Sequence, residues 1–81
     1  MNIEVRLFAA AKDAAGNAMV SLTVPEHTTV AELRQHLVAA APALATMQQT
    51  LFVAVNNQYA NADDVIRATD KIACFPPVSG G

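Results

Sequence analysis

The chain has 81 residues, a formal net charge of −2 and one cysteine. This length allows one domain with a small core, and a lone cysteine excludes an internal disulfide and any four-cysteine metal or iron–sulfur site. The basic residues are scattered, which argues against nucleic acid, and no apolar run approaches the roughly 20 residues of a membrane span. With no basic segment before an apolar run at the N-terminus, we expect no signal peptide and a reducing, cytoplasmic setting.

Two alternating segments open the chain and predict an antiparallel hairpin. In the first, every second residue is apolar: Ile3, Val5, Leu7 and Ala9. The second, residues 20–24, alternates in the same way and stops at Pro25. Between them, residues 12–17 include Gly16 and are expected to be a plain connection.

Residues 28–41 predict the main helix. Thr29 with Glu32 three positions later has the pattern of a capping box, in which each side chain bonds the other residue's free N–H group. One face at helical spacing is apolar: Val30, Leu33, Leu37 and Ala41. Pro42 disfavours helical geometry in the residue before it, so the helix should end at Ala41 or earlier.

Three further segments are expected to be strands: residues 51–55, a short returning strand at 58–60, and residues 71–75. Asn56-Asn57 predicts a turn. Residues 43–50 leave open whether another helical turn forms, and residues 62–68 suit a loop or a brief helical turn. The element order predicts an α+β fold, with a mixed sheet of four to five strands packed on one main helix. The domain should span residues 1–75, followed by a flexible tail at 76–81.

The sequence closes with Phe-Pro-Pro-Val-Ser-Gly-Gly, so two of its three glycines are the final residues. A Gly-Gly end can enter a cleft too narrow for any residue with a Cβ atom, and it presents a terminal carboxylate for chemistry. Pro76 and Pro77 should end the last strand and favour an extended conformation, so that the tail projects up to about 20 Å from the domain.

Three segments resemble the small, sulfur-carrying subunit of molybdopterin synthase: VAELRQHL at residues 30–37, AVN at 54–56 and ACFPPVSGG at 73–81. The order of elements resembles the β-grasp, or ubiquitin-like, fold, and the similarity covers nearly the whole chain. The family tail often has threonine at the place of Ser79 and a bulkier residue at that of Cys74. Gly-Gly alone would also suit ubiquitin-like modifiers and the sulfur carrier of the thiamin pathway.

The resemblance implies that a partner adenylyltransferase uses ATP to activate the carboxylate of Gly81, and that a sulfur donor then replaces AMP to give a thiocarboxylate. The tail would enter a large catalytic subunit and deliver sulfur to cyclic pyranopterin monophosphate, forming the dithiolene of molybdopterin. Besides Gly81, the inserted tail comprises Pro76, Pro77, Val78, Ser79 and Gly80. The chain is expected to bind no cofactor or metal and to supply no catalytic side chain, since no base lies beside a nucleophile. Whether it counts as an enzyme stays open, as do a modifier that forms isopeptide bonds and a noncatalytic binding module.

The alternation also predicts a docking surface. Phe8, Phe52 and Phe75 fall on the sheet face opposite the helix, with Tyr59 as a weaker candidate for the rim. Interfaces favour such aromatic anchors, although scattered exposed apolar residues are the alternative.

The remaining assignments are minor. Cys74 is expected in the core, His27 and His36 in structural or solvated positions, Asp63-Asp64 in a solvated or capping role, and Arg34 and Lys71 as weak candidates for pairing with acids on a partner.

Overall fold

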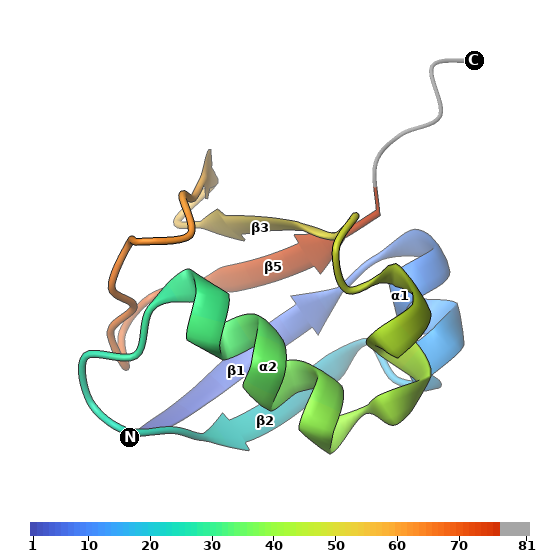
Figure 1. Cartoon of the computed structure of the whole chain (residues 1–81), viewed down its shortest axis with the longest axis horizontal. Coiled ribbons are helices and arrows are strands. Elements are labelled where there is room, and N and C mark those ends of the chain that lie inside the picture. The colour runs from blue at the N-terminus through green and yellow to red at the C-terminus, as the bar shows by residue number, and fades with distance from the viewer. Residues whose placement is uncertain (77–81) are drawn as a thin grey trace.

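The structure is a computed structural model, and it describes residues 1–76. Five strands form one mixed sheet: β1 (Asn2–Leu7), β2 (Met19–Thr23), β3 (Phe52–Val55), β4 (Gln58–Tyr59) and β5 (Ile72–Phe75). Their order across the sheet is β2-β1-β5-β3-β4, and the helix α2 (Val30–Ala40) crosses one face (Figure 1). The central pair β1–β5 is parallel and the other neighbours are antiparallel. This confirms the predicted α+β architecture.

The predicted pairing of the first two strands is confirmed, but their connection was predicted wrongly. Ile3 lies opposite Leu22 in the antiparallel β1–β2 ladder. The link between them contains a helix, α1 (Ala9–Ala15), and β1 ends at Leu7, before the Ala9 that alternation had included. The segment is rich in alanine, which favours a helix. Because only Ala11 of this helix is buried, the sequence shows no helical periodicity there. Gly16 ends α1 in left-handed geometry, with φ of 79°.

The predicted start of α2 is confirmed in atomic detail. The hydroxyl of Thr29 accepts a hydrogen bond from the backbone N–H of Glu32 at 3.3 Å, and the Glu32 carboxylate accepts one from the backbone N–H of Thr29 at 3.0 Å. The buried face consists of Val30, Leu33 and Leu37. The helix ends one residue before Ala41, and the segment left open in the sequence forms a 3₁₀ helix, η1 (Pro42–Met47).

Removing the capping hydroxyl should destabilise the domain. We expect Thr29→Ala to lower the free energy of unfolding by about 1 kcal/mol, because the N–H group of Glu32 loses its partner. Thr29→Ser keeps the hydroxyl and serves as the matched control. The backbone N–H and the hydroxyl of Thr29 both donate to the Glu32 carboxylate, at 3.0 and 3.1 Å, and these two hydrogen bonds lower the pKa of that carboxyl. The ionised Glu32 carboxylate therefore stabilises the folded domain fully above its ordinary pKa. This stabilisation is lost as the pH falls through the lowered pKa of the folded state. Urea unfolding of the two variants at pH 7 and in acid tests both points. An equal stability of Thr29→Ala and Thr29→Ser at pH 7 would contradict the role of the cap.

The core lies between α2 and the sheet, and strands, helices and loops all contribute side chains to it. The inward residues of β1 and β5 are almost fully buried, with Val5 at 0% and Ile72 at 2% exposure. Leu44 from η1 and Ile66 from the last loop complete it. None of the helices within residues 1–76 is long and apolar enough to cross a membrane.

The turn and the loop that precede β5 are tied to the rest of the domain. Asn56 and Asn57 both have positive φ, as predicted for the turn between β3 and β4. The side chain of Asn56 also donates to Asp70 and accepts from the backbone N–H of Lys71, each at 3.0 Å. Residues 62–68 form turns and a single bridge between Val65 and Thr29, which favours the loop alternative. The contacts of Asn56 hold Asp70 and Lys71 directly before β5, and so fix the point at which this last strand begins.

Candidate functional site

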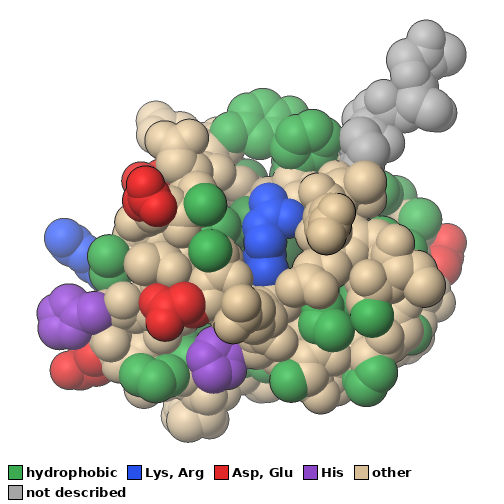
Figure 2. Space-filling model, viewed as in Figure 1, with side chains coloured by type: hydrophobic (Ala, Val, Ile, Leu, Met, Phe, Trp, Pro, Cys, Tyr) green, Lys and Arg blue, Asp and Glu red, His purple; other side chains and the backbone are tan. Residues whose placement is uncertain are grey.

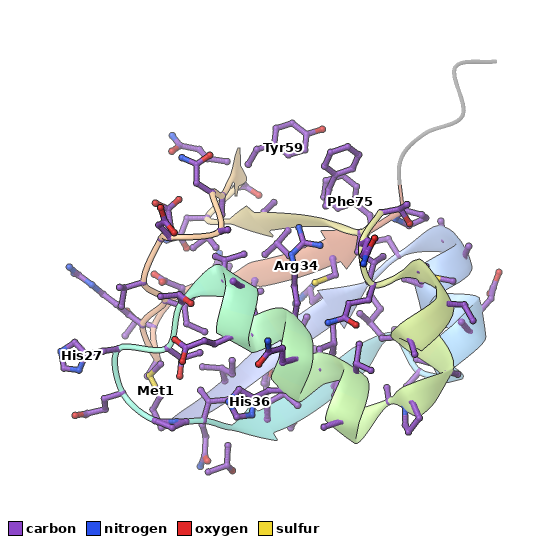
Figure 3. The ribbon with its side chains drawn as sticks, viewed as in Figure 1. Met1, His27, Arg34, His36, Tyr59 and Phe75 are labelled. Carbon is purple, nitrogen blue, oxygen red and sulfur yellow. The ribbon has the colours of Figure 1, made fainter. Side chains whose placement is uncertain are left out.

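Three aromatic rings form a cluster on the sheet face opposite α2. The ring centroids of Phe52 and Tyr59 lie 5.6 Å apart, and those of Phe75 lie 5.9 Å from each of them. Strand register explains the cluster, since Phe52 lies opposite Phe75, and Tyr59 lies opposite Ala54, which is two residues after Phe52. Figure 3 shows the rings of Tyr59 and Phe75 projecting away from α2. The sequence assigned Tyr59 to the rim, but the structure places it in contact with both phenylalanines.

Phe8 lies on the same face as this cluster. It directly follows β1 and is 48% exposed, and its backbone N–H donates to the carbonyl of Cys74 at 3.2 Å. Together with Tyr59 and Phe75 it lines a shallow hollow of about 340 Å³, whose floor contains Ala54 and Ala73. We call the four residues Phe8, Phe52, Tyr59 and Phe75 the aromatic face. All four predicted partner-binding residues therefore lie on one surface.

The aromatic face is unusual for a surface because its residues are large, apolar and adjacent. Phe52 is 43% exposed and Tyr59 is 73% exposed, while Phe75 is half-buried. Figure 2 shows hydrophobic side chains gathered along the upper edge of the molecule, next to the place where the described chain ends. Contiguous exposed aromatic residues of this kind mark interaction sites. Met19, which is 41% exposed, lies opposite Arg6 on the same face, and the alternation of β2 could have indicated this position.

The last strand, β5, leads to the end of the described chain and has a neighbouring strand on each side. β5 is bonded to β1 on one side and to β3 on the other, and it buries Ile72 and Cys74 in the core as predicted. Pro76 follows Phe75 directly and is half-buried. The other predicted tail residues lie outside the described residues: Pro77, Val78, Ser79, Gly80 and Gly81. The aromatic face therefore adjoins the last described residue of the chain.

Cys74 is a buried core residue and not a reactive thiol. Burial raises its pKa from the ordinary 9.0 to about 11, and the nearby positive charge of Arg34 opposes this rise only in part. The thiol is therefore protonated at neutral pH. The folded state prefers the protonated form, so the stability that Cys74 contributes is complete below pH 9 and is lost as pH rises towards 11.

The burial of Cys74 predicts slow alkylation. We expect iodoacetamide to modify the folded protein at pH 8 at least about 100-fold more slowly than the protein unfolded in urea, because a buried, protonated thiol neither meets nor attacks the reagent. The rate is followed by the mass of the intact chain, with the unfolded protein as the control. Equal rates for the folded and unfolded protein would show that Cys74 is accessible.

Two of the other candidate residues, Arg34 and Asp64, have structural roles. Arg34 is half-buried and donates to the carbonyl of Gln48 at 2.9 Å, so it ties α2 to the end of η1 (Figure 3). The Asp64 carboxylate accepts from the backbone N–H of Asn61, which confirms a capping role. His27 is exposed, and His36 is half-buried. Within residues 1–76, no three side chains of His, Cys, Asp or Glu lie close enough together to hold a metal ion. The aromatic face, by contrast, is suited to docking a partner protein.

Several known proteins match this chain over nearly its whole length. It is 35% identical to the molybdopterin synthase sulfur carrier subunit of Escherichia coli (strain K12), over 98% of this chain and 99% of that one. It also matches SAMP1 from Haloferax volcanii, a small archaeal modifier protein, with 32% identity and a TM-score of 0.89 over the full length of both chains. A chain in the complex of subunits 1 and 2 of molybdopterin-converting factor from Helicobacter pylori 26695 is 23% identical, with a TM-score of 0.70 and full coverage of both chains.

These solved structures confirm the predicted ubiquitin-like β-grasp fold. A family model also matches almost the entire sequence, from residue 5 to residue 81. The matched region starts at Val5, within β1, and runs through the terminal Gly-Gly. The chain belongs to the ThiS family.

Proposed function

We propose that this chain is the sulfur carrier subunit of a molybdopterin synthase. The observation that carries the proposal is the extent of the match: the family model runs to Gly81, and the Escherichia coli relative of nearly equal length is named as that subunit. The aromatic face supports the proposal, because a carrier has to be held beside its tail by each protein that acts on it. The lone reduced thiol suits a cytoplasmic protein.

The chemistry takes place at the carboxyl group of Gly81. A C-terminal carboxyl group has a pKa of about 3.5, so it is an anion at neutral pH and a poor electrophile. An activating adenylyltransferase joins one carboxylate oxygen to the AMP part of ATP and releases pyrophosphate. A sulfur nucleophile from a donor then attacks the carbonyl carbon, and AMP leaves. The sulfur of the resulting thiocarboxylate attacks a carbon of cyclic pyranopterin monophosphate. Water then cleaves the bond between this sulfur and the Gly81 carbonyl carbon, which leaves the sulfur on the pterin and restores the carboxylate. Two such transfers supply the two sulfurs of the dithiolene. ATP is consumed by the partner and not by this chain.

This chain contributes shape and binding surface, while its partners contribute catalytic side chains. Gly80 and Gly81 carry no side chains, which allows the end of the tail to pass through a narrow channel. The aromatic face docks the domain on the large catalytic subunit, and Pro76 to Ser79 span the distance to its active site. The complex of subunits 1 and 2 from Helicobacter pylori contains a chain of this fold, which supports a large subunit as the partner.

Intact-mass spectrometry tests the proposal. The protein is incubated with the activating enzyme of the same organism, ATP and a sulfide donor. We expect a mass increase equal to the exchange of one oxygen for sulfur, located at Gly81 by fragmentation. A variant lacking Gly81 is the control and should remain unchanged. A carboxylate that stays unmodified in the wild-type protein under these conditions would overturn the assignment.

A protein modifier is the second candidate, and the 32% identity to SAMP1 over the full chain favours it. Activation would begin identically, but a lysine Nζ atom would attack the adenylate and release AMP to form an isopeptide bond. Conjugates that keep the Gly-Gly remnant on lysines of other proteins would support this function. Their absence from cells that contain the thiocarboxylate would leave sulfur transfer as the function.

A further inference from the structure

Arg6 lies between apolar residues on the open face of the sheet. Strand register aligns five residues in one row across this face: Met19, Arg6, Ala73, Ala54 and Tyr59. The neighbouring row, towards the tail, holds Phe52 opposite Phe75. Arg6 is exposed and has Met19 on one side and Ala73 on the other. A partner that covers the aromatic face therefore covers Arg6 as well.

Arg6 has no partner of its own within residues 1–76. Its guanidinium donates no hydrogen bond there, unlike that of Arg34, which bonds to Gln48. The carboxylate of the nearby Asp70 instead accepts from the side chain of Asn56 and from the backbone N–H of Arg67, at 3.0 and 2.7 Å.

A second acid near Arg6 is Glu4. Glu4 precedes Arg6 by two residues on β1, and both line a hollow of about 370 Å³ together with Lys71. On the β2 side Glu4 lies opposite Ser21, and Lys71 directly precedes Ile72, the partner of Val5 in β5. Glu4, Asp70 and Lys71 thus line the same hollow as Arg6, but within residues 1–76 neither acid forms a hydrogen bond with its guanidinium, whose donors remain available to a partner.

The surroundings of Arg6 leave room for a side chain from another protein. Ala54 and Ala73 are small, and they line the hollow that also contains Arg6 and Phe8. Covering an unpaired guanidinium with apolar surface is unfavourable, because it removes water from a charge without replacing it. A carboxylate avoids this cost, since it can accept two parallel hydrogen bonds from the planar guanidinium.

We propose that the protein docking on the aromatic face places an Asp or Glu side chain against Arg6, in the hollow above Ala73. This inference rests on the proposed function, which identifies that protein as the large catalytic subunit. The aromatic face supplies most of the affinity. The pair with Arg6 selects the correct partner and sets the orientation of the domain, because a misdocked or mismatched surface would leave the charge buried and unpaired.

Binding measurements with the large subunit of the same organism test the pair. We expect Arg6→Glu to weaken binding at least about 100-fold and Arg6→Leu about 10-fold, with little change in the unfolding midpoint, because Arg6 is exposed. The matched control is Arg67→Glu, which makes the same charge change at an exposed arginine outside the aromatic face. Replacing the facing acid of the large subunit by Lys should restore much of the binding of Arg6→Glu.

The outcomes separate the two proposals. If the wild-type protein binds and Arg6→Glu behaves like Arg67→Glu, the pair does not exist and the proposed function stands. Binding by Arg6→Leu that equals or exceeds wild-type binding likewise overturns the pair. If the wild-type protein fails to bind the large subunit, the proposed function fails and this inference fails with it. A restored interaction between the two charge-reversed proteins supports both.

Discussion

Deletion of Gly81 is expected to reduce sulfur delivery to below detection while leaving the unfolding midpoint unchanged. The reacting carboxyl group would then belong to Gly80 and would fall one residue short of the sites that adenylate and consume it, and catalysis tolerates little displacement of a reacting group. The buried core ends at Cys74, so the domain does not need this residue to fold. Formation of molybdopterin from cyclic pyranopterin monophosphate, with the activating enzyme, ATP and the large subunit, is the measurement.

The matching experiment lengthens the chain. One alanine added after Gly81 puts a methyl group on the reacting residue and should abolish delivery as completely as the deletion. Ser79→Ala is the control, because it alters the tail and keeps both glycines. An extended protein with wild-type activity, shown by its intact mass not to be trimmed, would contradict the mechanism.

Replacing Phe75 by Asp should weaken binding of the large subunit by about 30- to 1000-fold, the range expected when an aromatic anchor is lost. The new carboxylate would be covered by apolar surface on docking, and it would sit beside Phe52 and Tyr59. The domain should stay folded with a modest loss of stability, because Phe75 is half-buried and each lost aromatic contact contributes about 1 kcal/mol. Isothermal titration calorimetry gives the affinity, and urea unfolding gives the stability.

Two further variants separate docking from folding. Tyr59→Asp changes a side chain that is 73% exposed, so we expect a loss of binding with almost no loss of stability. Val65→Asp places the same charge at a residue that is 50% exposed and outside the aromatic face, so its binding should match the wild type. Wild-type affinity in Tyr59→Asp, or equal losses in all three variants, would show that the aromatic face is not the docking surface.

Local sequence signals predicted the elements whose pattern is strong. Thr29 and Glu32 marked the start of α2, and Asn56-Asn57 marked a turn that needs positive φ at both residues. Alternation assigned the three phenylalanines to one face of the sheet and Cys74 to the core. These inferences need only the period of a strand or the chemistry of a cap, and neighbours in the chain supply both.

Features that depend on pairing between distant segments were beyond the sequence. The contact of Tyr59 with Phe52 and Phe75 requires the registers of two ladders, so the sequence assigned Tyr59 only to the rim. The position of Arg6 between Met19 and Ala73 depends on two more ladders. The helix α1 was missed for another reason, since Ala9–Ala15 buries a single side chain and therefore has no periodicity to detect.

The parallel pairing of β1 with β5 has a mechanical consequence. The two strands lie side by side and run in the same direction, so Met1 and Pro76 are at opposite ends of the sheet (Figure 1). Tension applied between the two ends of the domain would load the β1–β5 ladder in shear, and its hydrogen bonds would have to break together instead of one after another. Because β5 is hydrogen-bonded to a strand on each side, a partner that pulls on the tail should move the whole domain before it separates the strands of the sheet.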